Sequence, residues 1–309
     1  MGAAAHIVIV GGRRELLDVA VARIEQLEAR WSRFRSTSEI SAINAASGAP
    51  VIVSPDTLDI VARALDARET TRGWFDPTVL DALTAAGYDR SYEQLDTVDA
   101  NAPIARRGDE RPATAKLHVT PRVDVDRIVG AIRLESGARL DLGGIGKGRA
   151  ADLVATELSA LGARGVLVSL GGDLRAIGDA PTSHGWIIEM ESVLGTAFGR
   201  IALGDGAVAT SSQLTRRWRR DGAAMHHLID PHTRACARSD IAACTVISGE
   251  AERAEVIAKA ALIAGATRGA ALVGDLDVAA QFVLLDGSIE RFGGFDRFVL
   301  AGAPTTLAA

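Results

Sequence analysis

The chain has 309 residues, of which 34 are Lys or Arg, 39 are Asp or Glu and only two are cysteines. A formal net charge of −5 counts against a protein that binds nucleic acid mainly through phosphate contacts, and Cys236 and Cys244 cannot form a disulfide framework. No stretch approaches the roughly 20 uninterrupted apolar residues of a membrane span. Because the N-terminal residues also lack a signal pattern, we expect a cytoplasmic protein of ordinary folded composition.

Hydrophobic spacing in the first part of the chain predicts one strand and two helices. Residues 6–10 form a short apolar run that ends at two glycines, which indicates a strand. Apolar residues then recur three or four positions apart through residues 13–34, a spacing typical of a helix. The predicted buried face of this helix comprises Leu17, Val21, Ile24, Leu27 and Trp31. A second helix is expected over 55–71, because proline favours an early helical position and Gly73 follows the end.

The rest of the chain alternates between predicted strands and helices. Residues 96–112 predict a polar surface loop, and a helix is expected over 147–161 with Ala150, Val154, Leu158 and Leu161 on its inner face. An Ala-rich helix over 252–264 is apolar nearly all round and is expected to be buried. Strands are expected near residues 116–120, 131–134, 166–169, 174–177, 186–190, 199–203 and 241–248. Strand pairs separated by helices indicate an α+β fold rather than regular βαβ repetition.

A glycine-rich turn at residues 140–148, Leu-Asp-Leu-Gly-Gly-Ile-Gly-Lys-Gly, directly precedes one predicted helix. Backbone N–H groups at a helix N-terminus favour an anion, and Lys147 adds a positive charge. The segment is not a P-loop, since Gly148 stands where that motif requires Ser or Thr. Phosphate binding and a tight structural turn are both open at this point. A second turn, residues 171–173, is expected to be a structural strand connection.

Three of the six histidines, His226, His227 and His232, lie within seven residues. Adjacent residues on a strand point to opposite sides, which counts against a zinc site built from His226 and His227. A catalytic histidine is favoured, because an Asp-Pro turn follows and fixes the local geometry. The alternative is that all three histidines are solvated on a loop.

Two further patterns concern charge. The run at residues 216–220, Arg-Arg-Trp-Arg-Arg, fits an RNA- or phosphate-binding patch, but the net acidity favours the solvent-facing side of an edge strand. Glu255 and Lys259 are four residues apart on the predicted apolar helix. Two charges on so apolar a helix indicate a functional site.

Five motifs carry a family resemblance, and they span nearly the whole chain. They are residues 32–35 with 38–40 and Asn44, residues 73–79, residues 141–148 with Asp152, residues 209–211 leading to 227–233, and residues 254–255 leading to Gly265. In this order they resemble the ApbE family, the FAD:protein FMN transferases. The first residues, Met-Gly-Ala, are similar to the start of the family's first strand.

The resemblance implies an α+β, two-lobed fold related to a duplicated T-fold, with FAD in the cleft between lobes and residues 1–309 as one domain. Family members cleave the FAD pyrophosphate, attach FMN through a phosphoester to a Ser or Thr of an acceptor protein, and release AMP. His227 matches the histidine that assists removal of the hydroxyl proton. The implied FAD contacts are Met1, Phe34, Trp74, Phe75, Asp76, Asp141, Lys147 and Ile229.

The resemblance also implies Mg²⁺ at the positions of the Gly144 backbone, Glu255 and Lys259. The family usually has Asp and Thr at the last two positions, and a protonated lysine cannot ligate a metal. We therefore predict weakened magnesium dependence, or transfer assisted by Lys259. The alternatives are a non-catalytic FAD-binding protein and an FAD pyrophosphatase that gives free FMN and AMP. Nucleic acid is not an expected partner, and no membrane span is expected.

Overall fold

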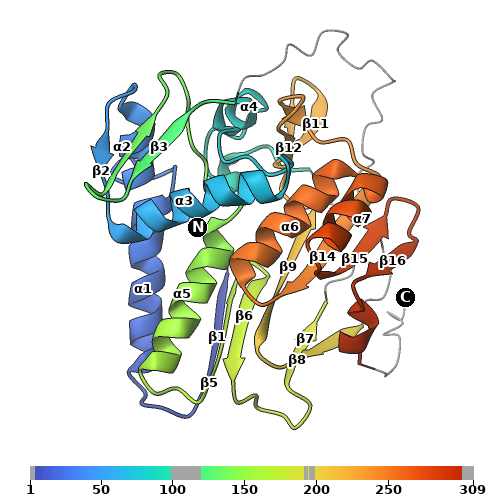
Figure 1. Cartoon of the computed structure of the whole chain (residues 1–309). Coiled ribbons are helices and arrows are strands. Elements are labelled where there is room, and N and C mark those ends of the chain that lie inside the picture. The colour runs from blue at the N-terminus through green and yellow to red at the C-terminus, as the bar shows by residue number, and fades with distance from the viewer. Residues whose placement is uncertain (1–3, 99–119, 191–193, 195–198, 301–309) are drawn as a thin grey trace.

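A seven-stranded antiparallel sheet organises the fold, which we describe from a computed structural model covering residues 4–98, 120–190, 194 and 199–300. Its strand order is β1-β5-β6-β9-β14-β15-β16, and strands distant in the sequence lie side by side (Figure 1). The strands are β1 (Ala5–Val10), β5 (Gly165–Leu170), β6 (Asp173–Gly178), β9 (Gly206–Ser212), β14 (Ile241–Ser248), β15 (Ala279–Leu284) and β16 (Ile289–Phe292). Antiparallel pairing throughout this sheet confirms the predicted α+β class.

Four helices cover one face of this sheet: α1 (Leu16–Trp31), α5 (Gly146–Ala160), α6 (Ala251–Ala264) and α7 (Ala266–Asp275) (Figure 1). Successive side chains of β5 pack on opposite faces of the sheet. Val166 and Val168 pack in the core on the helix side, while Leu167 packs in the core on the other side. There Leu167 meets the hairpin β7 (Trp186–Glu189) and β8 (Arg200–Leu203) and the short helix η2 (Phe295–Phe298). The sheet is therefore buried on both faces.

A second group of elements packs over one end of these helices. It contains α2 (Glu39–Ala45), α3 (Pro55–Thr70), α4 (Leu80–Ala85), η1 (Tyr92–Gln94), and the strands β2 (Val51–Ile52), β3 (Val123–Asp126), β4 (Ala131–Leu134), β10 (Arg217–Arg220), β11 (Ala223–His226), β12 (Ile229–Asp230) and β13 (Ala235–Cys236). Ser38 and Ser54 cap α2 and α3 by accepting backbone N–H bonds. Asn44 accepts a 2.7 Å bond from the Leu140 N–H and donates a 2.9 Å bond to the Leu140 carbonyl, which fixes the glycine-rich segment. No helix within the described ranges is both long and apolar enough to cross a membrane.

The structure corrects the predicted faces of two helices. Leu17 and Val21 are 49% and 45% exposed, and the buried stripe of α1 starts one residue earlier, at Leu16 and Ala20. The hydrophobic spacing favoured the larger side chains of Leu17 and Val21, whereas the side chain that contacts the core is the small Ala20. Leu161 is 47% exposed because α5 ends one residue before it. Most of the predicted strand at 116–120 and most of the loop at 96–112 lie outside the described residues.

The close approach of α5 and α6 depends on Gly148. A β-carbon at this position would lie 2.5 Å from the backbone carbonyl of Ala251, a contact that neither helix backbone can relieve without shifting. Gly148→Ala is therefore expected to lower the free energy of unfolding by about 1–3 kcal/mol. Gly274→Ala is the matched control, because Gly274 lies in α7 with nothing within 4 Å of the added carbon. Urea denaturation checks both variants, and equal stability of the two would contradict this account of the helix contact.

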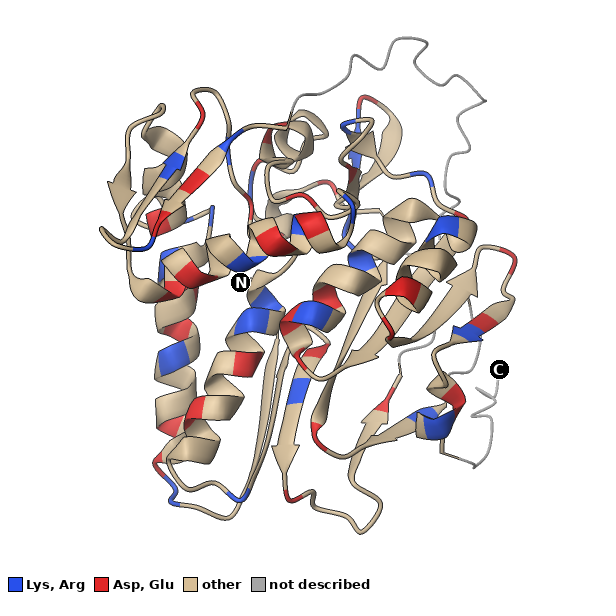
Figure 2. Cartoon of the chain, viewed as in Figure 1, with Lys and Arg blue, Asp and Glu red and all other residues tan. Residues whose placement is uncertain are grey.

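Charged residues gather where α3 meets α5 and α6 (Figure 2). Glu252 of α6 is 7% exposed, with Oε1 3.4 Å from Arg63 Nη1 and Oε2 3.6 Å from Arg149 Nε. Burial raises the pKa of Glu252 to about 7, against the opposing effect of the two arginines. Burial likewise raises the pKa of Asp152 to about 6, although Asp152 accepts bonds from the N–H groups of residues 251 and 252. These two carboxyls retain protons in the folded state to unusually high pH.

This retention predicts a pH-dependent stability. Since the pKa of Glu252 is higher in the folded state than its ordinary value of 4.5, its contribution is fully present below pH 4.5 and is lost as pH rises through 7. The loss is on the order of 3 kcal/mol. The free energy of unfolding, measured with urea from pH 4 to pH 8, should therefore decline less steeply with pH for Glu252→Gln than for the unchanged protein. Glu250→Gln, on a half-exposed neighbour, should not change the slope, and an unchanged slope in Glu252→Gln would refute the assignment.

Candidate active site

A cavity of about 340 Å³ opens between the helix layer and the second group of elements. Its wall comes from segments far apart in the sequence: residues 31–35 at the end of α1, residues 74–76, the glycine-rich turn at 141–144, and residues 227–229. The volume lies within the range usual for small-molecule sites. The cavity joins aromatic and charged side chains that no local pattern would place together.

The structure brings most of the predicted site residues to this cavity. Met1 lies outside the described residues. Glu255 does not reach the cavity wall, because it is 2% exposed and lies behind Lys147. Among the predicted site residues, those that line the cavity are Phe34, Trp74, Phe75, Asp76, Asp141, Gly144, Lys147, His227, Ile229 and Lys259.

The glycine-rich turn delivers the first turn of α5 to the cavity. The Asp141 N–H donates a 2.8 Å bond to the Pro77 carbonyl, which ties the turn to the loop that carries Asp76. The helix begins at Gly146, so Lys147 is its second residue and also lines the cavity. The helix dipole and the adjacent ammonium favour an anion here, and the Glu255 carboxylate already accepts the Gly148 N–H of this first turn.

Two lysines and two carboxylates form a compact cluster beneath this turn. The Lys147 ammonium donates to Asp173 and to Glu255 Oε1, while Glu255 Oε2 accepts a 2.9 Å bond from the Gly148 N–H. Lys259 Nζ lies 4.0 Å from Glu255 Oε1 and 3.4 Å from the Gly143 carbonyl oxygen. Although burial disfavours the charged form of Lys147, the two carboxylates outweigh it and raise its pKa. Lys147 is therefore a fixed positive charge.

Arg33 supplies a second positive charge, held among aromatic rings. Its Nε lies 3.3 Å from Asp141 Oδ1, and its Nη1 donates a 2.9 Å bond to the Tyr88 carbonyl. The guanidinium carbon lies 4.1 Å from the centroid of the Phe34 ring and 4.6 Å from that of Tyr88. The buried Nη2 has no hydrogen-bond partner among the described residues. This wall suits a planar ring system joined to an anionic group.

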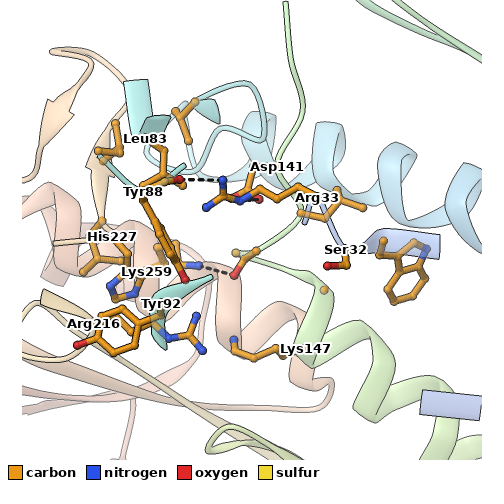
Figure 3. A pocket seen from close by; sticks show the side chains of 18 of the residues that line it. Ser32, Arg33, Leu83, Tyr88, Tyr92, Asp141, Lys147, Arg216, His227 and Lys259 are labelled. Atoms are coloured by element: carbon orange, nitrogen blue, oxygen red, sulfur yellow. Dashed lines mark hydrogen bonds and ion pairs between the residues drawn. The ribbon is translucent and has the colours of Figure 1, made fainter. Parts of the chain in front are cut away.

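Figure 3 shows His227, Lys259, Lys147 and Arg33 pointing into the same cavity from four separate segments. The buried Nδ1 of His227 has no hydrogen-bond partner within the described part of the chain. Burial lowers the pKa of His227 well below its usual value, and the charges of Lys259 and Arg216 act in the same direction. His227 is therefore a neutral imidazole at neutral pH, with a nitrogen free to accept a proton.

The neighbouring His226 does not line the cavity. Its Nε2 lies 3.0 Å from the Ala237 carbonyl oxygen, and burial lowers its pKa to about 4. The strand β11 ends at His226, so His227 lies in the bend after it and the two histidines do not share a strand. No group of three or more His, Cys, Asp or Glu side chains suited to a metal occurs among the described residues.

Several residues of the site were not predicted from the sequence to belong to it. Arg216 was assigned to a solvent-facing run, but it lines the cavity, and Arg217 and Trp218 are 2% and 1% exposed. Only Arg219 and Arg220 face solvent as predicted. The run departs from the expectation because Trp218 packs under Tyr88 and donates a 2.8 Å bond to the Ala86 carbonyl. The other missed residues are Arg33, Tyr88, Tyr92 and Asp173.

Three of these missed residues had a signal in the sequence, and one of them, Arg216, belongs to the arginine run that fits a phosphate-binding patch. Arg33 lies inside the first family motif, and Asp173 follows a glycine pair. The structure confirms that residues 171–173 connect two strands, β5 and β6, but Asp173 also holds Lys147.

The chain is similar to several known proteins. The ApbE family matches residues 1–282. The chain is 29% identical over 307 residues to the FAD:protein FMN transferase of Treponema pallidum, covering 92% of this chain and 83% of that protein. It is also 29% identical over 255 residues to the FAD:protein FMN transferase of Vibrio cholerae, covering 81% and 73%.

Solved structures show the same fold. The crystal structure of the ApbE protein from Thermotoga maritima superposes with a TM-score of 0.82 at 26% identity, covering 97% of both chains. The flavin transferase ApbE from Vibrio cholerae superposes with a TM-score of 0.78 at 23% identity, covering 97% of this chain and 96% of that one.

Proposed function

The chain belongs to the ApbE family, and we propose that it transfers FMN from FAD to a Ser or Thr hydroxyl of an acceptor protein, releasing AMP. One observation carries the proposal: a neutral histidine with a free nitrogen, a helix N-terminus and two lysines face one cavity lined by aromatic rings. The relatives that share most of the chain are named FAD:protein FMN transferases. We propose that the cavity binds FAD.

The wall of the cavity suggests how FAD is held. Phe34, Tyr88 and Trp74 offer ring faces for the flat flavin and adenine systems. Lys147 offers a positive charge to the pyrophosphate, in addition to the positive end of the α5 dipole. Asp76 and Asp141 offer carboxylate acceptors for the polar edges of the rings and the ribose hydroxyls.

The transfer step is a displacement at phosphorus. The acceptor hydroxyl oxygen forms a bond to the phosphorus of the FMN half, and the bond from that phosphorus to the bridging oxygen breaks. AMP leaves with the electron pair of the broken bond, and the hydroxyl proton goes to the free imidazole nitrogen of His227. Such a step needs positioning and charge neutralisation more than covalent chemistry from the protein. Lys147, Lys259 and the helix N-terminus supply that neutralisation.

Magnesium, which the family resemblance implies, finds a poor donor set in this chain. Mg²⁺ prefers six oxygen ligands in near-octahedral geometry. The Glu255 carboxylate already accepts from the Lys147 ammonium and from the Gly148 N–H, and the Lys259 ammonium is its next neighbour. These residues do not fit a magnesium ion, and no step above uses one. A cytoplasmic location and a single domain over residues 1–309 stay predictions.

Product analysis tests the proposed function. The purified protein is incubated with FAD, with and without a lysate of the cell that produces it, and nucleotides are separated by chromatography. We expect AMP to be released when the lysate supplies an acceptor protein, without an equal amount of free FMN. Equal amounts of free FMN and AMP would indicate an FAD pyrophosphatase. Bound FAD with no AMP would indicate a binding protein.

A further inference from the structure

Lys259 lies next to the glycine-rich turn and lines the cavity. Its side chain comes from α6, one helical turn after Glu255, and only 15% of it is exposed. Its Nζ lies 3.4 Å from the Gly143 carbonyl oxygen and lines the cavity (Figure 3). The ammonium therefore lies between the buried carboxylate of Glu255 and the space available to a ligand.

The glycine turn and this lysine fit each other closely. A β-carbon at Gly144 would lie 2.6 Å from Lys259 Nζ and 2.9 Å from the Phe75 ring. Residue 144 is not at a positive φ angle, so the backbone conformation alone does not require glycine there. The absence of a side chain instead leaves room for the ammonium against the turn.

The charges around Lys259 are already balanced. Lys147 and Lys259 supply two positive charges, and Asp173 and Glu255 supply two negative charges, with the Lys147 ammonium in contact with both carboxylates. A divalent cation placed at Glu255 would face two ammonium groups at close range, which is unfavourable in a buried site. An incoming pyrophosphate, in contrast, would find two ammonium groups and no free carboxylate of this cluster.

We propose that the Lys259 ammonium, and not a divalent metal ion, is the cation that neutralises the FAD pyrophosphate during FMN transfer. The inference rests on the proposed function and names a further catalytic residue for it. When the bond between the FMN phosphorus and the bridging oxygen breaks, the electron pair stays on the AMP phosphate. Lys259 stabilises that developing charge with a hydrogen bond and keeps its own proton. The hydroxyl proton of the acceptor still goes to His227, so the atoms balance without a metal.

The first test compares metal conditions in the unchanged protein. FMN transfer from FAD to protein acceptors of the lysate is measured with EDTA and with Mg²⁺, after the protein and the lysate have been stripped of metal. We expect rates within about twofold of each other. Transfer that occurs only with Mg²⁺ would overturn the inference and leave the proposed function intact. No transfer under either condition would overturn the proposed function.

The second test removes the charge. Lys259→Met keeps the unbranched side chain, one atom shorter and without the ammonium, and we expect it to lower transfer in EDTA by about 10²–10³-fold, the usual cost of one lost charge-stabilising donor. Lys259→Thr removes the ammonium and adds an oxygen, and we expect its transfer to become dependent on Mg²⁺. Full activity of Lys259→Met in EDTA would refute the inference.

A binding measurement separates this role from a structural one and does not depend on turnover. ADP carries a pyrophosphate and riboflavin carries no phosphate, so the two probes report on different parts of the cavity. By calorimetry in EDTA, Lys259→Met should bind ADP at least about tenfold more weakly and riboflavin as tightly as the unchanged protein does. Equal loss of both ligands would indicate damage to the cavity and would contradict the inference, as would unchanged ADP binding.

Discussion

Replacing His227 with alanine is expected to lower the rate of FMN transfer by about 10²–10⁴-fold, the usual contribution of a general base. The imidazole faces the cavity with an unpartnered buried nitrogen, and its lowered pKa keeps it neutral and ready to accept the hydroxyl proton. Binding of FAD should change little, since a neutral imidazole adds no charge to the pyrophosphate site. Transfer rates and FAD affinity, measured on the same preparation, check both parts.

The matched control for this variant is His184→Ala. His184 is exposed, lies just before β7 and does not line the cavity, so its removal should leave transfer and FAD binding unchanged. If His227→Ala transfers FMN as fast as the unchanged protein does, His227 has no part in the mechanism.

The second large effect is on stability. Lys147→Met should lower the free energy of unfolding by about 3–5 kcal/mol, because it leaves the buried carboxylates of Asp173 and Glu255 without their shared ammonium. Adding Asp173→Asn to the same chain should recover part of the loss, since it removes one of the two uncompensated charges. Urea denaturation near neutral pH measures both variants.

An exposed ion pair provides the control for Lys147. Arg90 and Asp89 form a salt bridge with side chains 57% and 42% exposed, so Arg90→Met should leave the free energy of unfolding nearly unchanged. A similar cost for Lys147→Met and Arg90→Met would mean that the buried cluster is not held together by its lysine.

Local patterns in the sequence predicted most of the helices and strands. The caps and spacing of residues 55–71 and the run at 147–161 match α3 and α5 almost to the residue, because such signals are local. The α1 face was misassigned by one position, since periodicity alone cannot tell a small buried Ala20 from a large exposed Leu17 or Val21. Strand order in the sheet depends on pairings between distant segments, such as β1 with β5, which no local pattern contains.

The candidate site shows the same difference between local signals and contacts of distant segments. The glycine-rich turn and His227 carry signals within a few residues, and both were predicted. Asp173 and Arg216 become part of the site only when the chain folds, because their partners lie far away in the sequence. The balance of charge around Lys259 likewise depends on α5, α6 and the β5–β6 turn meeting at one place. Spacing could therefore suggest a functional role for Lys259 but could not decide which groups neutralise it.

The central claim is that this chain forms a covalent bond between FMN and another protein. The most direct measurement incubates it with FAD in a lysate of the cell that produces it, separates the proteins under denaturing conditions and looks for flavin fluorescence. We predict a fluorescent band whose peptide carries FMN, less one water, on a Ser or Thr, and no such band with His227→Ala. A lysate in which FAD is consumed while every protein remains unmodified would contradict the claim.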